Sequence, residues 1–79
     1  MTLKIISAED ILFEGEVSAV RLPGQQGAFT VLRNHASLIS TLTPGEITYE
    51  KPDGEEGEPI SVNGGIVDVD RNVVSVCIY

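Results

Sequence analysis

Apolar and polar residues alternate in short runs along most of this chain, and glycine, proline or asparagine separates one run from the next. In the last run every second residue, from Val74 to Ile78, is a large aliphatic one. Each such run predicts a half-buried β-strand, because successive side chains of a strand point to opposite faces. The expected strands cover residues 3–7, 11–13, 17–22, 28–32, 46–50, 59–62, 66–70 and 73–79. Many short strands joined by turns favour an all-β fold, either a sandwich or a barrel.

The connections carry their own signals. Pro23, Gly24 and Gly27 predict a turn over residues 23–27. A type II turn at Pro23-Gly24 is expected, because proline fixes φ at the first central position and glycine supplies the positive φ of the second. Thr43-Pro44-Gly45 predicts another turn. The stretch 51–58 is acidic and contains Pro52-Asp53-Gly54, so it predicts an exposed hairpin loop.

Two segments are harder to assign. Leu38 and Ile39 are adjacent and blur the alternation over residues 37–42, so a helical turn capped by Asn34 is an alternative to a strand there. Over residues 17–22, strict alternation places Val20 and Leu22 on one face and Val17 on the other.

Composition limits the possible partners. The chain has 79 residues, which predicts one domain over residues 1–79 with a single modest core. Its formal charge is −7, with five basic residues against twelve acidic ones, which argues against binding to nucleic acid or to anionic lipid. No apolar run is long enough to cross a bilayer and the start does not resemble a signal peptide, so a soluble cytoplasmic protein is expected.

Residues that could carry chemistry are few. The chain has one histidine, His35, and one cysteine, Cys77, which lies in a strand-patterned segment whose neighbours look packed. Nucleophilic triads and His/Cys metal sites need more such residues than this, and the acidic loop lacks the ligand spacing of a calcium site. The segment from Gly24 to Gly27 has no lysine and no helix after it to hold a phosphate. We therefore expect no catalytic residue, no cofactor and no metal, and a binding or structural module.

An ordered set of short motifs resembles one known family. The motifs are Leu3-Lys4-Ile5-Ile6-Ser7-Ala8-Glu9, Phe13-Glu14-Gly15-Glu16-Val17, Leu22-Pro23-Gly24-Gln25-Gln26-Gly27-Ala28-Phe29, Val31-Leu32, His35-Ala36, Leu38-Ile39, Thr43-Pro44-Gly45, Asn63-Gly64-Gly65-Ile66-Val67-Asp68-Val69 and Val73-Val74-Ser75-Val76. Together they resemble the N-terminal β-sandwich domain of the epsilon subunit of bacterial F-type ATP synthases, called delta in mitochondria. The chain departs from the usual family pattern at Thr30, at Arg33-Asn34 and at Ser37. Family members commonly continue into a two-helix C-terminal domain, so a chain without it is expected to lack the brake on ATP hydrolysis.

The resemblance implies two packed, mostly antiparallel sheets in a non-catalytic subunit of the central stalk. Such a subunit binds the gamma subunit and rests on the ring of c subunits, as a peripheral part of the complex at the cytoplasmic face of the inner (plasma) membrane. Because Ile6 and Ile66 are out of phase with the inward residues of their strands, they are candidates for a patch that gamma covers. The implied gamma contacts are Ser7, His35, Ile6 and Ile66, and the implied c-ring contacts are Gln25, Gln26, Gly27, Ala28 and Arg33.

Two other interpretations remain open from the residues. One is a stand-alone acidic β-sandwich adaptor unrelated to the rotary motor. The other is a small enzyme that uses His35. The adaptor is favoured only if no stable complex with gamma forms. Replacing His35 by alanine tests the enzyme, because an enzyme would lose turnover whereas a stalk subunit would keep its fold and at most bind gamma less tightly.

Overall fold

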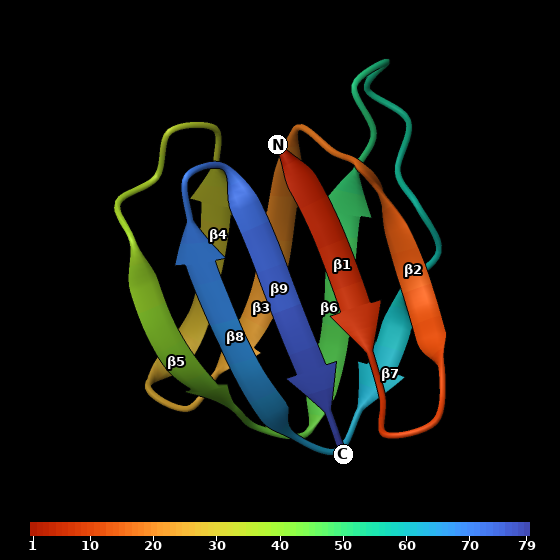
Figure 1. Cartoon of the computed structure of the whole chain (residues 1–79), viewed down its shortest axis with the longest axis vertical. Helices are drawn as coiled ribbons and strands as arrows, with labels where there is room; N and C mark the ends of the chain where they lie inside the picture. The colour runs from red at the N-terminus through yellow and green to blue at the C-terminus, as the bar shows by residue number, and fades with distance from the viewer.

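Nine β-strands and no helix make up the computed structural model, which describes all residues from 1 to 79 (Figure 1). The strands are β1 (Thr2–Ile6), β2 (Ile11–Glu16), β3 (Ala19–Gly24), β4 (Gly27–Leu32), β5 (Leu38–Leu42), β6 (Gly45–Glu50), β7 (Ile60–Val62), β8 (Gly65–Asp70) and β9 (Val73–Ile78).

The strands form two layers, which lie one behind the other in Figure 1. The front layer has the order β2-β1-β9-β8-β5, and the back layer contains β4, β3, β6 and β7. All pairs are antiparallel except β1 with β9, the first and last strands, which run parallel. The layers are joined where Gly24 of β3 pairs with Leu42 of β5, so one mixed sheet curls over on itself. The predicted all-β sandwich of short, mostly antiparallel strands is confirmed.

Fifteen apolar residues fill the space between the layers. In β8 and β9 the alternation is strict, with every second side chain buried. No polar or charged residue is buried, so the interior holds together by apolar packing alone. The core residues are Met1, Leu3, Ile5, Val17, Val20, Leu22, Val31, Leu42, Ile47, Val62, Val67, Val69, Val74, Val76 and Ile78.

The acidic connection between β6 and β7 folds back onto Tyr49. The Gly57 N–H donates to the Tyr49 carbonyl at 3.0 Å, and a Cβ added at Gly57 would collide with the Tyr49 ring. The Tyr49 ring also packs against Phe13, whose ring centroid is 4.3 Å away. Only glycine therefore allows this connection to lie so close to the ring.

Two local predictions are wrong, and one open alternative is resolved. Pro23 and Gly24 are the last residues of β3, and the turn follows at Gln25 and Gln26, with the positive φ of 124° at Gly27. Proline has no N–H to contribute to a sheet, but the Pro23 carbonyl still accepts the N–H of Thr43 at 2.8 Å. The strand therefore continues through the position where a turn is predicted.

The assignment of residues 38–42 and the burial of Val17 have one cause. The local alternation of apolar residues does not show which strand lies beside a segment. Residues 38–42 form a strand and not a helical turn, because β5 pairs with β8 along its whole length. Val17 is buried in the same core as Val20, against the prediction, because the chain bends after β2 and the Ser18 N–H bonds to Glu50 of β6.

Candidate partner-binding face

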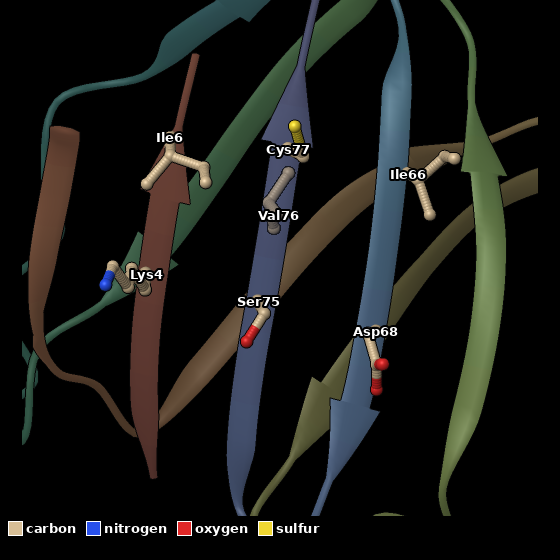
Figure 2. A pocket seen from close by; sticks show the side chains of 7 residues that line it. All are labelled: Lys4, Ile6, Ile66, Asp68, Ser75, Val76 and Cys77. Atoms are coloured by element: carbon tan, nitrogen blue, oxygen red, sulfur yellow. The ribbon is translucent and has the colours of Figure 1, made fainter. Parts of the chain in front are cut away.

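The outer face of the front layer carries a row of apolar side chains, of which Ile66, Cys77 and Ile11 are exposed and Ile6 is half-buried. Ile66 of β8 pairs with Cys77 of β9, Cys77 pairs with Ile6 of β1, and Ile6 pairs with Ile11 of β2. Figure 2 shows Ile66, Cys77 and Ile6 at the same height on three neighbouring strands. We call Ile66, Cys77, Ile6 and Ile11 the apolar row.

A second row, two residues away along each strand, is polar. Asp68 pairs with Ser75, and Ser75 pairs with Lys4 (Figure 2). A shallow open pocket of about 340 Å³ lies over both rows and is lined by Lys4, Ile6, Ile66, Asp68, Ser75, Val76 and Cys77. The face thus offers an apolar strip with one positive and one negative side chain beside it, on different strands.

Strand alternation explains why these apolar residues face outward. Val76 and Ile78 are buried, so Cys77 between them must point to the solvent side. Its neighbours are packed, as the sequence indicates, whereas Cys77 itself is exposed. Ile66 is 48% exposed and Ile11 is 56% exposed, which is unusual for side chains of this size and typical of a surface that another molecule covers.

The candidate gamma contacts are divided between the two ends of the sandwich. The lower end in Figure 1 holds the final residues of β1, β5 and β9, and the upper end holds the connections after β4 and β8. Ile6 and Ile66 lie together in the apolar row, and Ser7 follows β1 at the lower end. His35 lies in the connection before β5, at the upper end, where it is exposed and its Nδ1 lies 2.8 Å from the Ala36 carbonyl oxygen.

The candidate c-ring contacts are divided in the same way. Gln25, Gln26, Gly27 and Ala28 form the exposed β3–β4 turn at the lower end, where Gly24 meets the end of β5. Arg33 follows β4 and is at the upper end.

The upper corner around Arg33 is tied to the neighbouring turn. The Asn34 N–H donates to Asn72 Oδ1 at 2.6 Å, and Asn72 Nδ2 donates to Asn34 Oδ1 at 3.0 Å. We call this reciprocal pair the Asn34–Asn72 clasp. Both residues have positive φ, 63° for Asn34 and 62° for Asn72, a conformation that asparagine tolerates better than most residues. Ser37 adds a hydrogen bond to Asp70 Oδ1 at 2.8 Å, so the corner is held at two points.

One ionisable group, the Glu16 carboxyl, has a shifted pKa. Glu16 accepts hydrogen bonds from the Thr2 hydroxyl at 2.8 Å and from the Met1 ammonium at 3.2 Å. The Thr2 hydrogen bond, followed by the ammonium, lowers the pKa of the Glu16 carboxyl below its ordinary value.

No group of three or more His, Cys, Asp and Glu side chains is arranged to hold a metal ion. No helical segment suited to crossing a bilayer is present.

Some residues of the face were not identified from the sequence. Ile11 and Leu12 are both exposed because a register shift between Ile5 and Ile6 lets two β2 residues oppose one of β1. Ile39, at 75% exposure, continues the exposed apolar surface onto β5 and pairs with Asp68. The neighbouring pair Leu38-Ile39 was the available signal, since one of two adjacent strand residues must face outward.

A small β-sandwich with a largely exposed apolar row across one sheet is typical of the class of modules that pack against other proteins. The particular family is established by comparison. Residues 1–78 match the beta-sandwich domain of the ATP synthase delta/epsilon chain, and the chain belongs to this family. The resemblance inferred from the motifs is therefore confirmed.

Curated relatives carry the same assignment. The ATP synthase epsilon chain of a Nitratiruptor species is 46% identical over 72 residues, which are 91% of this chain and 55% of the relative. The ATP synthase epsilon chain of Leptospira borgpetersenii is 42% identical over 76 residues, which are 96% of this chain and 58% of the relative. The chain thus spans a little over half the length of these relatives.

Solved structures agree on the fold. A chain in the Euglena gracilis mitochondrial ATP synthase superposes with a TM-score of 0.88 at 23% identity, covering 96% of this chain and 48% of that one. A chain in the central stalk and c-ring structure of Tetrahymena thermophila mitochondrial ATP synthase superposes with a TM-score of 0.77 at 13% identity, covering 98% of this chain and 61% of that one. At these identities the likeness shows a shared fold.

Proposed function

We propose that this chain is a non-catalytic subunit of the central stalk of a rotary ATP synthase, where it binds the gamma subunit and contacts the c ring. Its role is to pass rotation between the ion-driven ring and the catalytic sector, at the cytoplasmic face of the membrane. The observation that carries the proposal is the apolar row on a chain of this family. It joins Ile6 and Ile66, the two residues whose phase in the sequence indicated a covered patch.

The apolar row is the proposed gamma contact. It runs across β8, β9 and β1, each of which is paired with a strand on both sides, and ends on the edge strand β2. A rigid sheet face needs little ordering on binding, so more of the contact energy appears as affinity. Ser7, at the lower end of β1, borders this row, and His35 would reach gamma only from the upper end.

The c-ring contact is proposed for the β3–β4 turn, Gln25 to Ala28. This turn is exposed and projects from the lower end, and its uncharged side chains suit a surface of polar loops. Arg33 lies at the other end, so the turn and Arg33 touch the same flat surface only if the long dimension of the domain, 29 Å, lies along that surface.

Binding to gamma is tested by co-expression with the gamma subunit of the same organism, followed by native mass measurement. We expect a one-to-one complex. In a second step, Ile66→Ser and Ile6→Ser are each expected to weaken binding about thirtyfold, because a central apolar contact at an interface contributes about 2 kcal/mol.

The matched control is Leu32→Ser. Leu32 is 57% exposed, similar to Ile66, but it lies on β4 in the back layer. It should leave the affinity unchanged. A chain that forms no complex with gamma supports the stand-alone adaptor instead, and equal losses for Leu32→Ser and Ile66→Ser refute the assignment of the face.

A further inference from the structure

We propose that Asn63 is a site of spontaneous covalent modification, at which the side-chain amide is lost by deamidation through the backbone nitrogen of Gly64. The inference does not depend on the proposed function. It rests on the geometry of the connection between β7 and β8 and on the chemistry of an asparagine that precedes a glycine.

Both reacting groups are free of protein partners. Asn63 is exposed, and its side chain makes no hydrogen bond within the chain. The Gly64 carbonyl accepts the Tyr79 N–H at 3.2 Å, but the Gly64 N–H donates to no protein acceptor. Gly64 is buried, and buried backbone N–H groups are mostly paired, so the Gly64 nitrogen is unusual in having no hydrogen bond that its attack would have to break. Glycine also places no side chain beside the nitrogen that would attack.

The reaction needs only water. The Gly64 backbone nitrogen gives up its proton and bonds to Cγ of Asn63, while the bond from Cγ to Nδ2 breaks and ammonia leaves. The product is a cyclic imide between the two residues. Water then opens the imide at either of its two carbonyl carbons, which gives an aspartate or, with the main chain routed through Cγ, an isoaspartate.

The other two asparagines of the sandwich corners provide an internal contrast. Asn34 and Asn72 have their side chains fixed in the Asn34–Asn72 clasp, and their next residues, His35 and Val73, carry side chains. The clasp engages both Oδ1 and Nδ2 of Asn72, which restricts the motion of its side-chain amide, and the β-branched Val73 crowds its own nitrogen. We therefore expect loss of the amide at Asn63 and retention at Asn34 and Asn72.

The two products should differ in their effect on the sheet. Aspartate adds one negative charge to an exposed bend, and the backbone path stays as it is. Isoaspartate inserts a carbon into the main chain between residue 63 and Gly64. The next residue, Gly65, lies so close to β9 that a Cβ there would collide with the Cys77 carbonyl oxygen. The isoaspartate form should therefore loosen the start of β8, where Ile66 meets Cys77 in the apolar row.

The test is incubation of the folded chain at mildly alkaline pH, followed by proteolytic digestion and mass spectrometry that separates aspartate from isoaspartate. We expect position 63 to convert to both products while Asn34 and Asn72 keep their amides. The Asn63→Ser variant should show no conversion in the same peptide. Asn63 remaining as intact as Asn34 and Asn72, or aspartate appearing without isoaspartate, overturns the proposal.

A second measurement separates the charge from the backbone change. The Asn63→Asp variant carries the charge alone and should melt close to the unmodified chain, whereas the isolated isoaspartate form should melt at a lower temperature. Equal melting temperatures for these two forms contradict the expected loosening of β8.

Discussion

A single substitution should remove both hydrogen bonds of the Asn34–Asn72 clasp and leave the domain folded. The change is Asn72→Gly. Asn72 is the second of two positive-φ residues, after Arg71 at 49°, in the tight turn between β8 and β9. Such a turn favours glycine at that second position, so the substitution removes the side chain and keeps the backbone.

The expected magnitude follows from two opposing contributions. The two hydrogen bonds of the clasp, at 2.6 and 3.0 Å, contribute about 0.5–1.5 kcal/mol each to stability. Glycine at φ 62° avoids about 1 kcal/mol of the strain that a side chain carries there. The net loss for Asn72→Gly is thus about 0–2 kcal/mol, whereas Asn72→Ala loses the hydrogen bonds and keeps the strain.

Urea unfolding and amide hydrogen exchange together test this account. Asn72→Ala should be roughly 1–3 kcal/mol less stable, and its melting temperature should fall by about 4–8 °C for each kcal/mol. Asn72→Gly should lose about 1 kcal/mol less stability than Asn72→Ala, and the Asn34 amide should exchange faster. Because the clasp is one unit, adding Asn34→Gly to Asn72→Gly should cost nothing further in hydrogen bonds. Equal destabilisation by Asn72→Gly and Asn72→Ala, or unchanged exchange at Asn34, refutes the reasoning.

Three further predictions concern the core, the acidic loop and one carboxylate. Ile47→Ala, at a fully buried site, should lower the free energy of unfolding by about 2–5 kcal/mol in urea, and a loss under about 1 kcal/mol would contradict complete burial. Gly57→Ala should push the loop off Tyr49, cost about 1–3 kcal/mol and speed amide exchange at Gly57; an unchanged rate would show that the ring moves instead. Glu16 has a lowered pKa in the folded state, so its contribution is present above the unfolded pKa and is lost as pH falls through the folded one. The Glu16→Gln variant should therefore be less stable than the parent at neutral pH and should match it in acid, as thermal melts across pH would show; a gap that persists in acid contradicts the assignment.

The sequence predicts the outward and inward faces best where strands alternate without interruption. In β8 and β9 the alternation correctly separates Ile66 from the buried Val67 and Val69. It places Val17 on the wrong face, because the chain bends after β2 and the alternation does not continue through the bend. The pattern of apolar and polar residues does not reveal this bend. It also misplaces the turn predicted at Pro23, since the carbonyl of that proline accepts hydrogen bonds from the N–H and the hydroxyl of Thr43, twenty positions later.

The candidate face could be predicted only in part, for a related reason. Periodicity gives the direction of a side chain but not the identity of the neighbouring strand. Ile6 and Ile66 were each marked by their phase, and only the pairing of β9 between β1 and β8 shows that Cys77 joins them in one row. Ile11 enters the row through an irregular register, which no local pattern encodes.

The parallel pairing of β1 with β9 has a consequence for how the domain is assembled. Each of these strands already has a hairpin partner close in sequence, β2 for the first and β8 for the last. We therefore expect the pairing of β1 with β9 to form slowly during folding, because it joins residues from opposite ends of the chain whereas each hairpin is local in sequence. Before β1 pairs with β9, each of these two strands has an unpaired edge. Exchange of strands between neighbouring copies is therefore expected at the β1–β9 pairing.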